Sequence, residues 1–258
     1  MDIAEFNRKA WDRAVGLKNR LTIPVTSDEI ARARAGEWTV FTTPRRPVPR
    51  DWFGDLKEAD VLALASGGGK QGPILAAAGA IVTVFDISPL QLEQDRMVAL
   101  RDQLEITTVQ GDMTNLEQFS SESFDLILLP CSNNHVEDLR PLWREAFRVL
   151  RSGGILISGF CHPIMFAIDE KLERSGIAQI KHKVPYSDTA SRTDAEKAQM
   201  LEAGIAFQFG HTLEDQIGGQ LRAGFVITDY YDDCAFEGDL LSTFLPPLGA
   251  TRAQKVSR

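Results

Sequence analysis

Three consecutive glycines, Gly67, Gly68 and Gly69, follow an apolar run at 61–64, and a lone carboxylate, Asp86, ends the next apolar run at 81–85. Glycines allow a sharp turn and the close approach of a ligand, and the start of a helix after the turn adds N–H groups without partners. An acid about 20 residues beyond such a turn can accept hydrogen bonds from a ribose. This spacing predicts a nucleotide-binding β-α-β unit.

Two cofactors fit this unit. Gly67, Gly69 and Gly72 match the G-x-G-x-x-G fingerprint of dinucleotide-binding folds, which indicates a nicotinamide-dependent oxidoreductase. The same region resembles motif I of the class I S-adenosylmethionine-dependent methyltransferases, in which a glycine-rich turn faces the methionine end of the cofactor. One glycine motif does not separate the two, so the rest of the chain must decide between them.

Apolar runs of strand length alternate with helix-like segments from residue 60 onward. Such alternation is typical of a parallel sheet that is covered by helices on both faces. We expect strands at 60–65, 81–85, 105–109, 124–130, 153–159 and 225–231, and helices at 72–79, 89–103, 136–150 and 212–222. The tail, 251–258, predicts one last edge strand and brings the sheet to seven strands.

Later segments resemble the remaining motifs of the class I methyltransferases, in the right order. Asp86 stands where that family has the acid that binds the adenosine ribose. The other matches are Gly111-Asp112-Met113 beside the adenine, the strand 124–129 beside the transferring methyl, the helix–turn–strand segment 145–157, and the entry to the sixth strand at 221–227. An oxidoreductase explains only the first two motifs, so the methyltransferase resemblance is the better account.

This resemblance implies a doubly wound, Rossmann-like α/β fold, with an N-terminal helical lid and an insertion after the fifth strand. It also implies S-adenosylmethionine as the cofactor. The residues that it places around the cofactor are Ala65, Ser66, Gly67, Gly68, Gly69, Gln71, Asp86, Ile87, Ser88, Gln91, Gly111, Asp112, Met113 and Pro130, with Trp11 on the lid. The four histidines lack metal-ligand spacing, so no metal is predicted.

The glycine turn departs from the family pattern at two positions. Ala65 replaces the first glycine of G-x-G-x-G, and Ala63 replaces an acid that commonly helps to hold the amino group of the cofactor. We expect Ser66 or Gln71 to serve as the polar partner instead. The two alanines also leave open a non-catalytic nucleotide-binding module with the same fold.

The acceptor is expected beside the segment that follows the strand 124–130. His135 is the candidate general base, because an imidazole near its ordinary pKa takes up a proton at neutral pH. His162 and His211 are second choices. Cys131 stands where RNA cytosine-5 methyltransferases have a catalytic cysteine, but the acid that precedes that cysteine is missing here, so a small buried residue is the preferred interpretation.

Residues 1–55 are interpreted as an N-terminal helical and extended cap, and residues 56–258 as the methyltransferase domain with an insertion at 160–210. Apolar residues at helical spacing predict a helix over 2–20, on which Asn7 and Trp11 can face the cofactor.

A proline-rich strap, residues 43–50, follows the expected short helix 28–35. Its arginines, Arg45, Arg46 and Arg50, are expected to be solvated rather than to form an anion-binding patch.

Composition narrows the class of protein. A net charge of −8 makes nucleic acid an unlikely partner, and no apolar run approaches the ~20 residues of a membrane-spanning helix. The N-terminus lacks the features of a signal peptide, and three unpaired cysteines favour a cytoplasmic protein with reduced thiols. The sequence therefore predicts methyl transfer to a small-molecule acceptor. An oxidoreductase, a non-catalytic module and an RNA methyltransferase are the alternatives.

Overall fold

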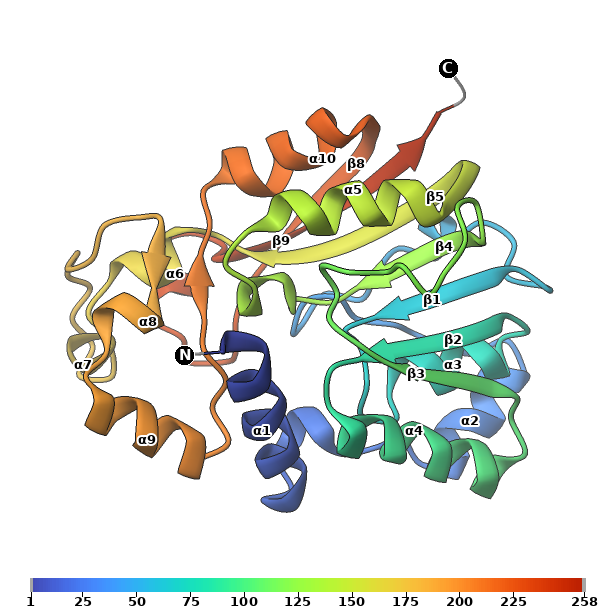
Figure 1. The fold of residues 1–258 in the computed structure, drawn as a ribbon, viewed down its shortest axis with the longest axis horizontal. Helices are drawn as coiled ribbons and strands as arrows, with labels where there is room; N and C mark the ends of the chain where they lie inside the picture. Colours follow the sequence, from blue (N-terminus) through green and yellow to red (C-terminus); the bar gives the residue numbers. More distant parts are fainter. Residues whose placement is uncertain (1, 257–258) are drawn as a thin grey trace.

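The computed structural model describes residues 2–256 and has one large sheet between two helical layers. Figure 1 shows α5 and α10 together over one face of this sheet, with α3 behind it. The strands are β1 (Asp60–Leu64), β2 (Ile81–Asp86), β3 (Ile106–Gln110), β4 (Phe124–Leu129), β5 (Leu150–Cys161), β8 (Phe225–Asp233) and β9 (Leu248–Lys255). The expected alternation of strands and helices is confirmed.

The strand order is β3-β2-β1-β4-β5-β9-β8. β3, β2, β1, β4 and β5 pair in parallel, whereas β9 is antiparallel to both β5 and β8. The doubly wound, mostly parallel seven-stranded sheet is therefore confirmed. The prediction of an edge strand at 251–258 is wrong: β9 lies inside the sheet, and β8 forms the edge. Residues 257–258 of that prediction lie outside the described part of the chain.

The larger helices are α1 (Ile3–Gly16), α2 (Ser27–Arg34), α3 (Gln71–Ala77), α4 (Pro89–Asp102), α5 (Leu139–Val149), α9 (Asp194–Glu202) and α10 (Gly219–Ala223). Alternate residues of β1 supply two cores, because successive side chains of a strand point to opposite faces. Val61 and Ala63 pack with Leu75 of α3 and Leu92 of α4, whereas Leu62 and Leu64 pack with the buried face of α5.

The insertion at 160–210 alternates short helices with loops. It contains α6 (Ile164–Ala167), α7 (Glu170–Glu173), α8 (Asp188–Ser191) and α9, and its strand β6 (Tyr186–Ser187) pairs with β7 (Phe209–Gly210). The late helix is also irregular, because a π-helical turn, Glu214–Gly218, precedes α10.

Helix α1 lies between α9 and α4 at the end of the molecule where the parallel strands finish (Figure 1). The expected N-terminal helix is thus present, although it ends at Gly16 rather than at residue 20. Asp2 caps it by accepting a hydrogen bond from the Glu5 amide.

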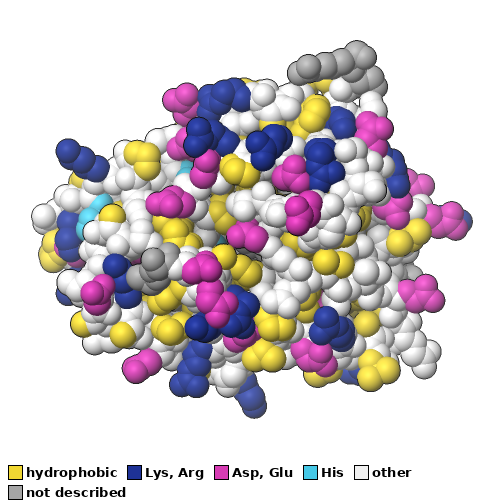
Figure 2. Space-filling view, in the orientation of Figure 1, with side chains coloured by type: hydrophobic (Ala, Val, Ile, Leu, Met, Phe, Trp, Pro, Cys, Tyr) yellow, Lys and Arg dark blue, Asp and Glu magenta, His cyan; other side chains and the backbone are white. Residues whose placement is uncertain are grey.

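On the face in Figure 2, acidic and basic side chains are interspersed, so that face presents no broad field of one sign. Among the described residues, no helix is both long and apolar enough to cross a membrane.

Candidate functional site

A cavity of about 1410 Å³ opens at the carboxyl ends of β1, β2 and β4, beneath α1. Ligands of doubly wound folds bind at this end of the sheet. The predicted residues that line it are Trp11, Ala65, Ser66, Gly67, Gln71, Asp86, Ile87, Gln91, Gly111, Asp112, Met113, Pro130 and His135. Gly68, Gly69 and Ser88 are not among its lining residues.

The glycine turn after β1 has a backbone that side chains would obstruct. Gly68 and Gly69 have φ values of +111° and +69°, in the left-handed region that favours glycine. A Cβ on Gly67 would lie 2.8 Å from the Cβ of Gln91 and 3.0 Å from Asp86 Oδ2. Ala65 also has a positive φ, +47°, although it carries a side chain. The turn therefore starts from a strained residue.

Two buried carboxylates occupy the amide groups of this turn. Asp86 Oδ2 accepts from the Gly67 N–H at 2.9 Å, and Asp95 Oδ2 accepts from the Gly68 N–H at 2.9 Å. A phosphate-binding turn needs such N–H groups to be free. The engaged amides disfavour a pyrophosphate at this turn.

Asp86, the predicted ribose acid, lies at the end of β2 and is almost fully buried. Burial raises its pKa to about 6, and the amide hydrogen bonds from Ser88 and Gly67 oppose that rise. Asp86 is therefore mostly ionised at neutral pH, and it contacts the cavity as a hydrogen-bond acceptor.

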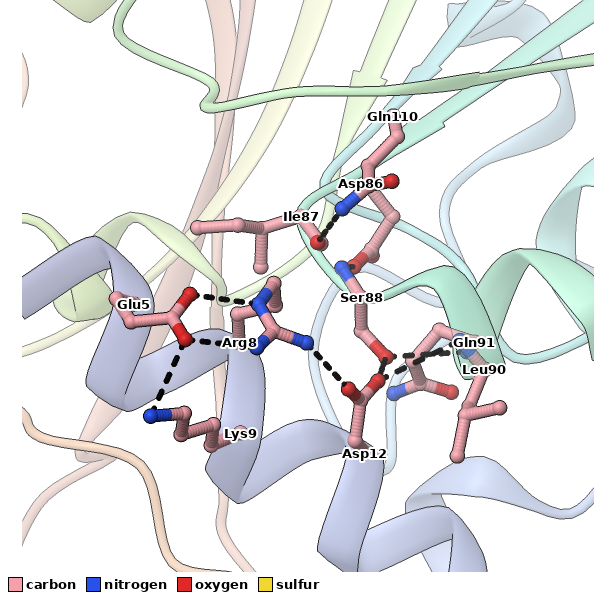
Figure 3. Close-up of polar contacts among 10 residues, drawn as sticks. All are labelled: Glu5, Arg8, Lys9, Asp12, Asp86, Ile87, Ser88, Leu90, Gln91 and Gln110. Atoms are coloured by element: carbon pink, nitrogen blue, oxygen red, sulfur yellow. Dashed lines mark hydrogen bonds and ion pairs between the residues drawn. The ribbon is translucent and has the colours of Figure 1, made fainter.

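Helix α1 is tied to the loop that carries Asp86 (Figure 3). Ser88 Oγ donates to Asp12 Oδ1 at 2.6 Å, while the Ser88 N–H donates to Asp86 Oδ1 at 2.9 Å. Arg8 holds the other oxygen of Asp12 at 2.8 Å. Ser88 thus links helix α1, the roof of the cavity, to Asp86.

The same helix contacts the loop after β4. Asn7 is buried; its Nδ2 donates to the His135 carbonyl at 2.9 Å, and its Oδ1 accepts from the Phe207 N–H at 2.8 Å. Trp11 packs edge-on against the His135 ring, with 5.4 Å between centroids. α1 therefore joins the two loops that flank the cavity.

His135, in a short 3-10 helix Asn133–His135, is the histidine that the fold brings to the cavity. Its Nδ1 lies 2.9 Å from the Phe207 carbonyl oxygen, and burial lowers its pKa. His162 and His211 do not line the cavity; His211 is held through Nε2 by the Val136 carbonyl. The two second choices are thus not supported as bases.

Cys131 lines the cavity beside Cys161. The pKa of the Cys131 thiol is raised well above its ordinary value by a hydrogen bond with Cys161 and by burial. A thiol that stays protonated at neutral pH is a poor nucleophile.

The polar substitutes for the missing acid at position 63 reach the cavity. Ala63 itself is fully buried in the core, whereas Ser66 and Gln71 line the cavity. Ser66 Oγ donates to Gln71 Oε1 at 3.4 Å, and Gln71 Nε2 donates to the Phe41 carbonyl at 3.1 Å. Gln71 therefore also ties the glycine turn to the chain segment that leads into the strap.

The strap, residues 43–50, is fixed by its backbone. Asp233 Oδ2 accepts hydrogen bonds from the backbone amides of Arg45 and Arg46, both at 2.9 Å. The side chains of both arginines are exposed, as expected. Arg50 is also exposed and stacks on Trp38 at 3.7 Å.

Sequence reasoning missed Asp95, Asn7's bridging role and Phe207. Asp95 had a detectable signal, because it shares the buried stripe of α4 with Leu92 and Val98, where an acid is out of place. Phe207 had none, since only its backbone contacts His135. Within residues 2–256 no cluster of three metal-ligating side chains is found.

Comparison with known proteins gives a consistent result. Residues 62–158 match the sequence profile of the methyltransferase domain family. The chain is 48% identical over 254 residues to the uncharacterized methyltransferase YbaJ of Bacillus subtilis, covering 98% of this chain and 99% of that protein. It is 28% identical over 190 residues to the ubiquinone/menaquinone biosynthesis C-methyltransferase UbiE of Escherichia coli, covering 70% and 72%.

Solved structures share the fold. An S-adenosylmethionine-dependent methyltransferase from Mesorhizobium loti has a TM-score of 0.61 at 20% identity, over 80% of this chain and 94% of that one. A second, from Methanosarcina mazei, has a TM-score of 0.60 at 19% identity, over 82% and 99%.

Proposed function

This chain belongs to the class I S-adenosylmethionine-dependent methyltransferases, and from that premise we propose that it methylates a small-molecule acceptor with an apolar body. The observation that carries the proposal is the cavity itself. It combines the glycine turn and Asp86 at one end with a mostly apolar wall at the other. Within this proposal, residues 1–55 act as the cap and residues 56–258 as the catalytic domain.

The cofactor end is assigned to the residues at the ends of β1, β2 and β3. Asp86 would accept from the ribose hydroxyls, and Gly111, Asp112 and Met113 would surround the adenine. Ser66 and Gln71 would accept from the amino group. When bound, S-adenosylmethionine supplies a methyl carbon that is activated by a positively charged sulfur; the chain's own contribution is to orient the two reactants and exclude water.

The acceptor end lies beyond Pro130. The lining side chains that pack together there are apolar: Cys131, Cys161, Met165, Ala235 and Leu248. Apolar linings with a few polar groups are typical of small-molecule pockets. A relative named as a quinone-biosynthesis C-methyltransferase supports an acceptor of this class.

His135 is proposed as the base for the acceptor. Because the Phe207 carbonyl can only accept a hydrogen, Nδ1 carries the proton and Nε2 keeps its lone pair. Burial lowers the pKa of the ring, which keeps it neutral at physiological pH. Nε2 is therefore the atom that would take a proton from an acceptor hydroxyl, amine or activated carbon.

The alternatives receive less support. A nicotinamide cofactor would set its pyrophosphate against amides that Asp86 and Asp95 already occupy. An RNA methyltransferase of the cysteine type would need a thiolate at Cys131, whose pKa is raised instead. If the acceptor is a small molecule, Cys131→Ala retains methyl transfer; loss of all transfer in that variant would favour the RNA reading.

The deciding experiment is isothermal titration of the purified protein with S-adenosylmethionine, S-adenosylhomocysteine and NADH. We expect the first two to bind and NADH not to bind, and Asp86→Ala to lose most of the affinity. A thermal shift gives a second readout, since ligand at about 100 times its Kd adds about 2.7 kcal/mol of stability.

The matched control is Glu93→Gln, which removes an exposed acid from α4. Unchanged affinity in Asp86→Ala would contradict the proposed cofactor site. The acceptor is then sought by measuring methyl transfer to a panel of quinols, phenols and amines, and to an RNA substrate for comparison. Transfer only to RNA would overturn the small-molecule proposal.

A further inference from the structure

Asp95 is a fully buried acid on α4 that does not line the cavity. Its Oδ2 accepts from the Gly68 N–H at 2.9 Å, a hydrogen that Gly68 shares with the Gln91 carbonyl at 3.1 Å. Asp95 Oδ1 is buried without a hydrogen-bond partner, and so is the side-chain oxygen of Gln91 four residues earlier. A buried acid with an unpaired oxygen lowers the stability of the folded state. Its presence therefore indicates a role other than stability.

The glycine turn needs an anchor on the side of α4. Ala65 starts the turn at a φ of +47°, where a residue with a Cβ is strained by about 1–2 kcal/mol. Gly68 and Gly69 both have positive φ, and glycine has more backbone freedom than any other residue type. Asp86 holds the turn only at Gly67. Without Asp95, the Gly68 N–H would keep only the Gln91 carbonyl, and the Gly69 carbonyl would keep the hydrogen bond that it accepts from the Val25 N–H.

We propose that Asp95 is a positioning residue that holds the glycine turn in the shape that receives the cofactor. It acts through Gly68 and Gly69, not by touching the ligand. Gly72, at the start of α3, lies next to Asp95. A Cβ there would be 3.5 Å from Asp95 Oδ1, an ordinary van der Waals distance, and 2.5 Å from Val84, which is the contact that excludes a side chain.

The acceptor oxygen, rather than the negative charge, carries this role. Burial raises the pKa of Asp95 to about 7, although hydrogen bonds from the Gly69 and Gly68 amides oppose that rise. The charge of Asp86 on β2 raises the pKa further. Asp12 on α1 also packs against α4, at the Leu90 N–H, and Lys70 at the end of the turn donates to the Arg20 carbonyl. A protonated carboxyl still accepts at Oδ2, so the anchor holds in both protonation states.

Two substitutions distinguish a role of the acceptor oxygen of Asp95 from a role of its negative charge. Asp95→Asn keeps an oxygen opposite Gly68 and adds an N–H donor where Oδ1 now has no partner. Asp95→Ala removes the acceptor. Leu142→Ala is the matched control, because Leu142 is also fully buried but lies in the core on the opposite side of the sheet. It lowers stability without contacting the turn.

The measurement is the Kd for S-adenosylhomocysteine by isothermal titration at neutral pH, with amide hydrogen exchange of the free protein alongside. We expect Asp95→Ala to raise Kd at least about tenfold and to speed exchange of the turn amides. Asp95→Asn should stay within about threefold of wild type, and so should Leu142→Ala despite its lower Tm.

This role of Asp95 rests on the proposed cofactor site, but the measurements distinguish a wrong site from a wrong role. If wild type does not bind S-adenosylhomocysteine, the site itself is wrong. If wild type binds and Asp95→Ala binds as tightly, or Leu142→Ala weakens binding equally, only the role of Asp95 is overturned. An Asp95→Asn variant as weak as Asp95→Ala would also overturn it, since the acceptor oxygen would not be what matters.

Discussion

The imidazole Nδ1 of His135 lies 2.9 Å from the carbonyl oxygen of Phe207, and this contact settles which ring nitrogen carries the hydrogen. The two residues are 72 positions apart in the chain. The bond orients the imidazole and leaves Nε2 as the nitrogen without the hydrogen, which is the atom we propose as the base. It also joins the loop after β4 to the end of the insertion.

His135→Asn should lower kcat by about 10²-fold with little change in the KM for the cofactor, because Asn keeps an N–H for Phe207 but has no basic nitrogen. Burial lowers the pKa of His135, so the acid limb of the wild-type kcat profile should fall below the ordinary histidine value of about 6.5 and vanish in the variant. Steady-state rates across pH check both points. A kcat within about twofold of wild type would remove His135 from the mechanism.

Asp12→Ala should loosen α1 over the cavity. Ser88 Oγ loses a charged acceptor and Arg8 loses an ion-pair partner. A hydrogen bond to a charged group contributes about 1.5–3 kcal/mol, so amides of residues 3–16 should exchange about tenfold faster. Hydrogen exchange read by mass spectrometry measures this.

The control for Asp12→Ala is Lys9→Ala, which removes an exposed partner of Glu5 on the same helix. Exchange at residues 3–16 should remain at the wild-type rate in that variant. Equal rates in wild type and Asp12→Ala would mean that the Asp12–Ser88 bond does not hold the helix down.

Ala65→Gly should be neutral or stabilising by up to about 1.5 kcal/mol. The strain of a left-handed alanine, about 1–2 kcal/mol, is relieved, and the greater freedom of glycine in the unfolded chain offsets about 0.5–1 kcal/mol of it. Ala63→Gly is the control, since position 63 is a regular strand residue and should lose about 1 kcal/mol. Urea denaturation compares the two; a destabilised Ala65→Gly would argue against strain at position 65.

The stability difference between wild type and Asp95→Asn should depend on pH. Burial raises the folded-state pKa of Asp95 to about 7, far above its unfolded value of 3.8, so the folded state binds more protons between these pH values. Wild type should therefore lose stability relative to the variant as pH rises from about 4 to about 7, and the difference should level off above that. Tm curves of both proteins test this; a flat difference would contradict it.

Much of the fold could be predicted from the sequence because the relevant signals are local. The alternation of strand and helix patterns, the glycine turn and the acid at the end of β2 each lie within a short stretch of chain. Most of the cofactor residues that the family resemblance implied line the cavity, although their contacts with cofactor stay predictions. The exceptions are Gly68 and Gly69, which belong to the turn itself, and Ser88, which is bonded to Asp86. Local spacing does not tell which residues of a turn face the cavity.

The order of the strands was harder to predict than their existence. The tail strand was expected at the edge, yet β9 pairs with β5 on one side and β8 on the other. An apolar pattern indicates that both faces of a strand are buried, but it does not indicate which neighbouring strands pair with it.

The sequence by itself thus determined the family, the sheet and the place of the glycine turn, since each follows from residue types at short, fixed spacings. Only the tertiary structure decided how the site is held. Asn7 reaches Phe207 across 200 residues, and Asp95 meets Gly68 only because α4 folds back under the turn. Such contacts depend on how elements pack. The buried stripe of α4 marks Asp95 as unusual, but no local pattern identifies Gly68 as its partner.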